Sequence, residues 1–256
     1  MTPVSIDELT AWMRARVAAA GARGIALGLS GGIDSAVVLG LAVRAVPGQV
    51  AGVLLPCHSD PQDEADGRLA AEAFGIEPMR VDLGPAYDTL LRGLDAAMTE
   101  LPAEQRSPSA AGDPKTALFT ANLKPRLRMT SLYFVANSLN YLVAGTGNRS
   151  ELTIGYFTKY GDGGVDMLPI GKLLKSEVRA MAKALGIPQP LIDKPPSAGL
   201  WEGQTDESEM GFTYADLERY LNDGPGTVSP ALGLRIERLQ RASDHKRALP
   251  PMPDDD

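Results

Sequence analysis

The sequence has very little cysteine and no long apolar run. One cysteine, Cys57, among 256 residues excludes an internal disulfide framework and any zinc or iron–sulfur site built from several cysteines. Nowhere do about 18 apolar residues follow one another, which is the minimum for a helix that spans a membrane. The first 21 residues also lack the apolar stretch of a secretion signal. These absences favour a soluble, cytoplasmic protein with no membrane partner.

Positive charge is scarce as well. The chain has 25 Lys and Arg against 32 Asp and Glu, a net charge of −7, which disfavours the broad basic surface that nucleic-acid binding needs. Apolar residues make up 44% and charged residues 22%, close to the averages of globular proteins. We expect one domain over residues 1–249 and a disordered acidic tail over 250–256.

Short apolar runs alternate with amphipathic segments over the first 144 residues. The pattern predicts strands at 24–29, 50–55, 79–83 and 141–144, and helices at 5–20, 34–46, 61–74, 86–101 and 118–139. Pro125 falls in the first turn of the last helix if Asn122 is its N-cap. The alternation predicts a doubly wound α/β fold, with a mostly parallel sheet and helices on both faces. Two stretches, 102–114 and 195–211, are expected to be mobile loops.

A glycine-rich turn follows the first predicted strand. It reads Gly28-Leu29-Ser30-Gly31-Gly32-Ile33-Asp34-Ser35. The glycines let the backbone approach an anion, two serines supply hydroxyl groups, and the following helix points free N–H groups at the turn. No lysine follows the glycines as in a Walker A loop, so transfer of a γ-phosphate is disfavoured. In a doubly wound sheet this turn and residues 145–151 should lie together at the switch in strand order.

The hexapeptide from Ser30 to Ser35 resembles the signature of the N-type ATP pyrophosphatases, which cleave ATP to AMP and pyrophosphate and leave an adenylated substrate. Later segments resemble the ammonia-dependent NAD synthetases within that superfamily. They are Asn122–Met129, Gly145–Leu152, Gly155–Asp166, Pro169–Lys172, Pro196–Trp201, Gly203–Glu207 and Asp244–Arg247. The resemblance implies an adenine nucleotide alpha hydrolase-like fold. It also implies a ligase that amidates nicotinic acid adenine dinucleotide (deamido-NAD) with ammonia, giving NAD, AMP and pyrophosphate through an adenylated carboxylate.

The resemblance also assigns roles to individual positions. ATP, the co-substrate, would be bound by Gly28, Leu29, Ser30, Gly31, Gly32, Ile33, Asp34, Ser35, Thr146, Lys175 and Ser197. Mg²⁺ would be held by Asp34 and Glu151, whose hard carboxylate oxygens suit it. Deamido-NAD would be bound by Arg126, Lys159, Asp166, His245 and Lys246.

Asp166 also carries a hypothesis about catalysis. A carboxylate beside the adenylated nicotinate could hold ammonium and take its proton, which would give the nucleophilic amine. The alternative for Asp166 is a structural cap on a turn. Asp34 could likewise only cap its helix, and Glu151 could be a solvated loop acid.

Free ammonia is the simplest nitrogen donor for such a ligase. Glutamine-dependent relatives carry a nitrilase-like domain before the synthetase, whereas 27 residues precede the phosphate loop here, and Cys57 is interpreted as a small buried residue. Apolar residues in the helix predicted at 118–139 exceed what one sheet face would cover, which the family's homodimer would explain. They are Leu127, Leu132, Phe134, Val135 and Leu139.

Two other functions remain as alternatives. The first is another pyrophosphatase, such as a GMP synthetase or a tRNA-modifying thiolase; the thiolases usually have more cysteines and a basic face for RNA. The second is a catalytically silent nucleotide sensor. A sensor has no need to keep both Asp34 and Glu151, so this alternative is disfavoured.

Overall fold

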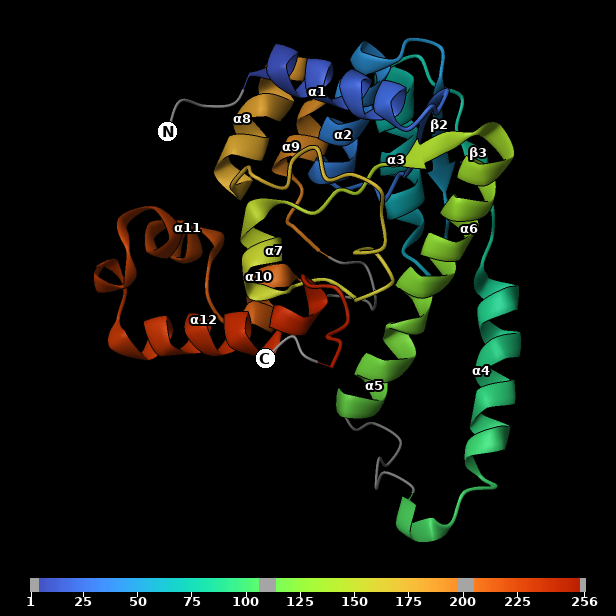
Figure 1. Cartoon of the computed structure of the whole chain (residues 1–256), viewed down its shortest axis with the longest axis vertical. Coiled ribbons are helices and arrows are strands. Elements are labelled where there is room, and N and C mark those ends of the chain that lie inside the picture. Colours follow the sequence, from blue (N-terminus) through green and yellow to red (C-terminus); the bar gives the residue numbers. More distant parts are fainter. Residues whose placement is uncertain (1–4, 106–113, 198–204, 254–256) are drawn as a thin grey trace.

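The structure is a computed structural model that describes residues 5–105, 114–197 and 205–253. Its sheet has the strand order β3-β2-β1-β4, and all neighbouring strands run parallel (Figure 1). The strands are β1 (Gly24–Gly28), β2 (Val50–Leu54), β3 (Met79–Arg80) and β4 (Tyr141–Val143). The strand order therefore switches direction at β1, between β2 and β4. The predicted α/β fold with a parallel sheet is confirmed.

One face of the sheet is covered by the N-terminal helices and two later ones. They are α1 (Ile6–Ala19), α2 (Ile33–Ala45), α3 (Pro61–Ala73), α8 (Lys175–Leu185) and α9 (Gln189–Asp193). Ile25 and Leu27 of β1 and Leu54 of β2 point into this layer, where they meet Leu39 and Leu41 of α2. Full burial of such a side chain contributes about 1.5–3 kcal/mol each, so this layer is the main apolar core.

The opposite face is covered by α4 (Gly84–Met98) and α6 (Leu123–Leu139), preceded by α5 (Pro114–Ala121). Alternate residues of the same strands point here, because successive side chains of a strand face opposite ways. Ala26 meets Ala136 of α6, and Val53 packs in a second cluster with Val135. Helices on both faces confirm the doubly wound arrangement. Figure 1 shows α4 and α5 extending well beyond the sheet, at the lower right.

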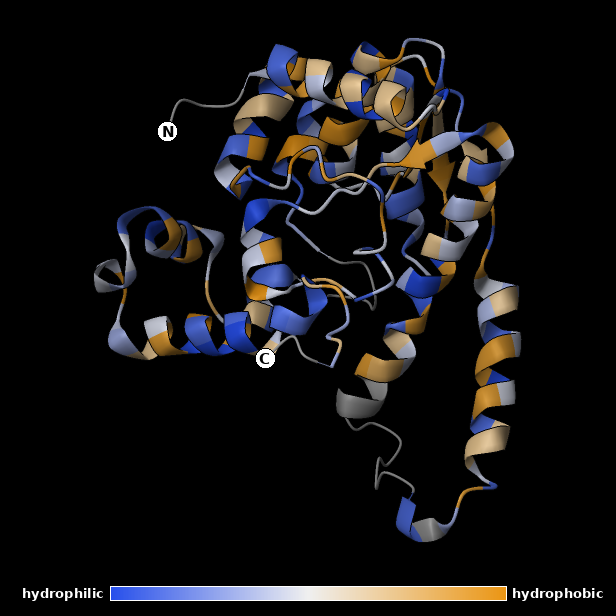
Figure 2. Cartoon of the chain, in the orientation of Figure 1, coloured by the Kyte–Doolittle hydropathy of each residue, from blue (hydrophilic) through white to orange (hydrophobic). Residues whose placement is uncertain are grey.

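The C-terminal part adds a small helical unit beside the sheet. It contains α7 (Arg149–Ile154), α10 (Asp206–Met210), α11 (Tyr214–Asp223) and α12 (Pro230–Ala242). Ile154, Met210, Leu217 and Ile236 form its own apolar cluster. Colouring by hydropathy shows the strands mostly apolar, whereas α11 and α12 are largely polar (Figure 2). This unit brings residues from beyond position 205 to the edge of the sheet.

The helical region predicted at 118–139 is divided into α5 and α6 by a break at Asn122, which lies at the N-cap of α6 and places Pro125 in its first turn, as the sequence suggested. Proline has no N–H, so Pro125 cannot donate to the carbonyl of Ala121, which lies four residues before it. Asn122 does occupy the N-cap position of α6, but its side chain makes no capping bond and accepts the Thr158 hydroxyl instead (2.7 Å).

Two other elements differ from the prediction. β3 covers only Met79–Arg80 rather than 79–83, because it is an edge strand that pairs with β2 alone. The predicted loop at 195–211 contains α10, which has Thr205 as its N-cap and Gly211 (φ +76°) as its C-cap; the Thr205 hydroxyl accepts the Ser208 N–H. Residues 106–113, 198–204 and 254–256 lie outside the described residues, so the mobility expected there and the disorder expected at the C-terminus stay predictions. None of the described helices is long and apolar enough to cross a membrane.

Candidate active site

The phosphate loop joins β1 to α2 and is held by its own hydroxyl groups. Ser30 Oγ accepts the Gly32 N–H (3.3 Å), and Ser35 Oγ donates to the Gly32 carbonyl (2.9 Å). Gly31 has φ +75°, and a Cβ there would collide with the carbonyl of Asp63. No side chain caps α2 at Gly32. The first amides of α2 are therefore available to an anion, as in other phosphate-binding helix N-termini.

A cavity of about 610 Å³ opens beside this loop, where the ends of β1, β2 and β4 meet. Its wall includes these residues of the predicted ATP site: Gly28, Leu29, Ser30, Gly32, Ile33, Asp34, Thr146, Lys175 and Ser197. Gly31 and Ser35 belong to the loop but do not line the cavity. The phosphate loop and the turn after β4 thus lie together at the switch in strand order.

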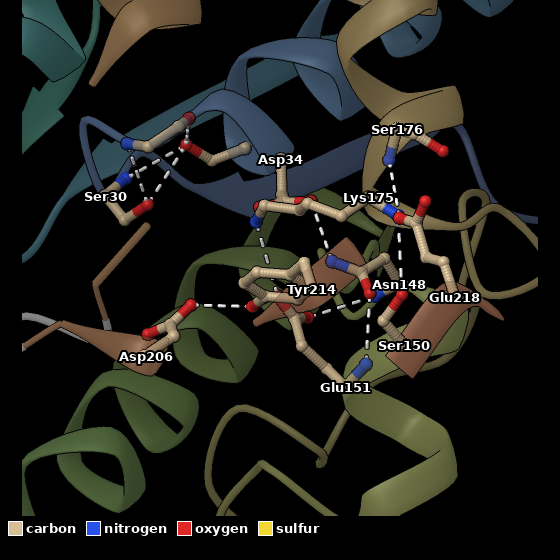
Figure 3. A network of polar contacts seen from close by, with 12 residues as sticks. Ser30, Asp34, Asn148, Ser150, Glu151, Lys175, Ser176, Asp206, Tyr214 and Glu218 are labelled. Atoms are coloured by element: carbon tan, nitrogen blue, oxygen red, sulfur yellow. Dashed lines mark hydrogen bonds and ion pairs between the residues drawn. The ribbon is translucent and has the colours of Figure 1, made fainter. Parts of the chain in front are cut away.

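Three charged side chains from three helices meet inside the cavity (Figure 3). Lys175 Nζ forms an ion pair with Asp34 Oδ2 and lies 3.5 Å from Glu151 Oε1. The Lys175 side chain is 3% exposed, and the two carboxylates are 15% and 16% exposed. Because an unpaired buried charge is costly, the ammonium group and the two carboxylates hold one another in place.

Asn148 forms hydrogen bonds with both Asp34 and Glu151. It was not assigned a role from the sequence. It is fully buried at the N-cap of α7. Its Oδ1 accepts the Glu151 N–H (3.0 Å), and its own N–H donates to Glu151 Oε2 (3.1 Å). Its Nδ2 donates to Asp34 Oδ1 (3.1 Å). The Asn-x-x-Glu capping box was the signal in the sequence that could have identified it.

Burial and charge change the acid–base properties of this cluster. Burial, reinforced by repulsion from Asp34, raises the pKa of Glu151 to about 8, although Lys175 opposes the shift. Burial by itself would lower the pKa of Lys175, but attraction to Asp34 and Glu151 outweighs it and raises that pKa. Lys175 therefore stays an ammonium, and the cluster favours positive charge between its carboxylates.

The donor set of this cluster fits a divalent cation. The Lys175 ammonium group already places positive charge between the oxygens of Asp34 and Glu151. Within the described ranges, no three His, Cys, Asp or Glu side chains are placed to hold a metal ion. Mg²⁺ typically uses one or two carboxylates and completes its shell with substrate phosphates and water. The two carboxylates beside a phosphate loop match that pattern.

Tyr214, the first residue of α11, reaches this cluster from the C-terminal unit. Its ring centroid lies 5.2 Å from Lys175 Nζ, a cation–π distance. Its hydroxyl donates to Asp206 Oδ2 (2.7 Å) and lies 3.4 Å from Glu151 Oε1. Neither Tyr214 nor Asp206 was assigned a role from the sequence: Asp206 lies within the segment 195–211 that was interpreted as a loop, and Tyr214 follows that segment.

Arg128, rather than Arg126, lines the cavity. The Arg128 guanidinium donates to the Leu55 carbonyl (3.2 Å) and to Ser59 Oγ (3.1 Å). Arg126 is exposed outside the cavity and donates to the Lys159 carbonyl (3.4 Å). Both arginines lie in the segment Asn122–Met129, so the sequence located the segment but did not indicate which arginine lines the cavity.

The other candidates for deamido-NAD binding form a chain of contacts beside the cavity. Lys159 Nζ donates to the His245 carbonyl. Lys246 lines the cavity and donates to the carbonyls of Gly155 (2.8 Å) and Phe157 (2.7 Å). The structure thus brings Arg126, Lys159, His245 and Lys246 together, with only Lys246 in the cavity wall.

Asp166 lies just outside the cavity wall, next to its lining residue Val165. Asp166 Oδ1 accepts the Tyr133 hydroxyl (2.9 Å), and Oδ2 accepts the N–H of Val143 at the end of β4 (2.8 Å). Both oxygens thus have donors, and the carboxylate is fixed against the sheet.

Cys57 is fully buried in the α4–α6 layer, and burial raises the pKa of its thiol.

Comparisons with known proteins agree with this geometry. A family model described as NAD synthase matches residues 5–250. The NH(3)-dependent NAD(+) synthetase of Carboxydothermus hydrogenoformans is 49% identical over 247 residues, 96% of each chain. Among solved structures, the NMN synthetase of Francisella tularensis matches with a TM-score of 0.86 at 36% identity, covering 97% of each chain. The NAD+ synthetase of Burkholderia pseudomallei matches with a TM-score of 0.75 at 30% identity, covering 97% of this chain and 93% of its own.

Proposed function

The chain belongs to the NAD synthase family, and on that premise we propose that it amidates deamido-NAD with ammonia in an ATP-dependent reaction. The products are NAD, AMP and pyrophosphate, which makes the protein a ligase that forms a C–N bond. The observation that carries this proposal is the pair Asp34 and Glu151 beside an uncapped phosphate loop, in one cavity with Lys175. The reaction belongs in the cytoplasm, where a lone thiol stays reduced.

The chemistry needs ATP because a carboxylate is a poor acyl donor whose leaving group would be oxide. In the first step a nicotinate oxygen attacks the α-phosphorus of ATP, and the bond from that phosphorus to the bridging oxygen breaks, releasing pyrophosphate. In the second step ammonia attacks the carbonyl carbon of the adenylate. The bond to the AMP oxygen then breaks and the nitrogen loses a proton, which leaves the amide.

The chain's own groups are placed to assist the first step. The amides of the phosphate loop and of the α2 N-terminus bind the leaving pyrophosphate. Asp34 and Glu151 would hold Mg²⁺, which neutralises the charge that develops on the phosphates when it is bound. Lys175 and Ser197 both line the cavity, and in this proposal the Lys175 ammonium group and the Ser197 hydroxyl would bind phosphate oxygens of ATP.

Asp166 serves the second step in this proposal by holding ammonium and taking its proton. Its support is position, since it ends the segment Gly155–Asp166 and is fixed at the carboxyl end of β4 beside the cavity. Arg126, Lys159, His245 and Lys246 would bind the remainder of deamido-NAD. The contacts of Lys159 with Arg126 and His245, and the place of Lys246 in the cavity wall, support a common task.

A homodimer is the proposed assembly. Large apolar side chains remain exposed on the helices of the α4–α6 layer, including Leu94, Phe119 and Phe134, the last of which is 76% exposed. Apolar surface gathered on one layer is typical of a protein–protein interface. Of the residues expected to drive dimerisation, Val135 is buried and Leu127 and Leu132 pack in the same layer, so Phe134 and Leu139 are the ones available.

The similarity to an NMN synthetase structure favours a second candidate, amidation of nicotinic acid mononucleotide. The same carboxylate and the same ATP chemistry would serve both acceptors. The two differ in whether an adenylate half must also be bound. The sequence relative at 49% identity is named for NAD, and the dinucleotide therefore stays the first candidate.

One assay tests both candidates. The protein is incubated with ATP, Mg²⁺, ammonium and either deamido-NAD or nicotinic acid mononucleotide, and the amide, AMP and pyrophosphate are measured. We expect the higher kcat/KM with deamido-NAD, with AMP and pyrophosphate formed in amounts equal to the NAD. Amidation of the mononucleotide alone would select the second candidate, and formation of ADP would exclude both.

A further inference from the structure

Tyr214 has one hydroxyl proton and two carboxylates within reach. Asp206 Oδ2 lies at 2.7 Å and Glu151 Oε1 at 3.4 Å from the Tyr214 oxygen. A phenolic hydroxyl can donate only one hydrogen bond at a time. The shorter distance assigns the proton to Asp206, so Glu151 Oε1 is not the principal acceptor of this hydrogen bond.

The oxygen of Glu151 within reach of Tyr214 is also the oxygen that faces the Lys175 ammonium group. Glu151 Oε1 is the atom that lies 3.5 Å from Lys175 Nζ, whereas Oε2 is occupied by the N–H of Asn148. A donated proton at Oε1 would withdraw part of its lone-pair capacity from a cation. Asp206, by accepting that proton, keeps Oε1 available.

The burial and hydrogen bonding of Asp206 agree with a role as the acceptor of the Tyr214 proton. It is 4% exposed, and its other oxygen, Oδ1, has no hydrogen-bond partner in the part of the chain that the structure describes. A buried carboxylate with an unpaired oxygen costs free energy, which a merely structural cap on α10 would not require. In Figure 3, Tyr214 lies between Asp206 and Glu151, and no direct contact joins the two acids.

We propose that Asp206 and Tyr214 form a positioning pair for the divalent cation of the ATP complex: Asp206 accepts the Tyr214 proton and thereby leaves Glu151 free to ligate. The inference rests on the proposed function, since it takes Glu151 as a ligand in the metal–ATP complex. It assigns to the C-terminal helical unit a task at the catalytic centre, through one residue of the cavity wall, Asp206, and one behind it, Tyr214.

The test compares a single variant, Asp206→Leu, with a double variant in which Tyr214→Phe is added to it. Asp206→Leu keeps the branching of the side chain at Cγ and removes the acceptor, which leaves Glu151 as the carboxylate within reach of the Tyr214 hydroxyl. Adding Tyr214→Phe then removes the proton and keeps the ring beneath Lys175. The charge of Asp206 is absent from both variants, so the difference between them isolates the proton. The double variant has no polar group at either position, so neither side chain is left without a hydrogen-bond partner.

The probe is Mn²⁺, titrated by electron paramagnetic resonance in the presence of α,β-methylene-ATP, which cannot release pyrophosphate. We expect Asp206→Leu to weaken Mn²⁺ binding and the added Tyr214→Phe to restore about tenfold of that affinity, the effect of one hydrogen bond to a charged group. Tyr141→Phe is the control, because it also loses a tyrosine hydrogen bond, to Gln49 (2.8 Å), but away from the cavity. It should leave Mn²⁺ binding unchanged.

Equal or weaker Mn²⁺ binding by the double variant than by Asp206→Leu would overturn the inference, as would Asp206→Leu binding Mn²⁺ as tightly as the unsubstituted protein. A thermal melt of each variant accompanies the titration, and the double variant should melt at or above the temperature of Asp206→Leu. Failure of the proposed function is read separately, from whether the unsubstituted protein forms NAD.

Discussion

At the scale of single residues, Asp166 has a proposed role in catalysis, as the base that takes a proton from ammonium. Asp166→Asn preserves shape but removes the charge that would hold ammonium and take its proton. We expect NAD formation at low ammonium and neutral pH to fall about 10²–10⁴-fold, the usual contribution of a general base. The deficit should shrink as pH rises, because a larger fraction of the donor is then already free ammonia.

Tyr133→Phe is the matched control for that substitution. It removes the hydrogen bond to Asp166 Oδ1 but leaves the carboxylate and its bond from Val143 in place. It should therefore lose much less activity than Asp166→Asn. Full activity of Asp166→Asn at low ammonium would make the base role untenable.

Cys57 gives a pH prediction with a definite sign. Burial raises the pKa of its thiol, so the folded protein has less of the reactive thiolate at any pH near neutrality than an unfolded chain. Iodoacetamide should label Cys57 slowly in the folded protein over pH 7–9 and rapidly in urea, as followed by mass spectrometry. Labelling at the same rate in both states would show that the thiol is accessible, contrary to its interpretation as a small buried residue.

Sequence patterns identified the phosphate loop and several charged residues of the cavity wall, but not the residues that support them. Asp34 and Glu151 occur in recognisable segments, and the fold brings them together. Asn148 was identifiable through its capping box, yet its bond to Asp34 joins residues that are 114 positions apart in the sequence and depends on the folded chain. Tyr214 and Asp206 could not be found, because nothing local in a sequence shows which distant carboxylate a tyrosine will reach.

At the scale of elements, the phosphate loop depends on its backbone shape. Gly31 and Gly48 both have positive φ, +75° and +73°, but only a Cβ at Gly31 would collide with a neighbour. Alanine at either position should cost about 1–2 kcal/mol of stability, since a side chain disfavours this backbone region. Gly31→Ala should also displace the loop and lower activity about 10²-fold.

Gly48→Ala is thus the control that separates backbone strain from loop geometry. Thermal melts and NAD assays on the two variants test the prediction. It is contradicted if Gly31→Ala keeps full activity, or if Gly48→Ala loses as much activity as Gly31→Ala.

Element boundaries were predicted best where burial and periodicity agreed. β1 and β2 end within one residue of their predicted limits, because both are buried runs bounded by turn residues. The apolar pattern continues through residues 118–139 and by itself predicts one helix. The break between α5 and α6 follows from the missing N–H of Pro125. α10 escaped prediction because its five residues lie in a glycine- and proline-rich region, although Thr205 and Gly211 marked its two ends.

At the scale of the whole molecule, the proposed homodimer makes a clear prediction. Phe134→Asp places a charge on the exposed face of α6 and should convert a dimer to a monomer without unfolding it, because the side chain is 76% exposed. Leu234→Asp is the control, since Leu234 is 65% exposed on α12, outside the α4–α6 layer. Sedimentation velocity should give a dimer for the unsubstituted protein and the control. A monomeric unsubstituted protein would remove the basis for the assembly.

The fold class followed from the alternation of short apolar runs with amphipathic segments, and the family followed from motifs spread along most of the chain. The C-terminal helical unit could not be predicted from these patterns, because its helices form a separate apolar cluster and no periodicity in the sequence links that cluster to the sheet. Its contribution to the cavity, through Asp206 and Tyr214, is a property of the assembled molecule.

The central claim is that ATP activates the nicotinate carboxylate as an adenylate, and oxygen transfer tests it most directly. Deamido-NAD labelled with ¹⁸O in its carboxylate is converted with ATP, Mg²⁺ and ammonium, and the products are analysed by mass spectrometry. The account predicts one ¹⁸O in the phosphate of each AMP and one retained in the amide of each NAD. AMP without label, or ADP with labelled inorganic phosphate, would contradict it.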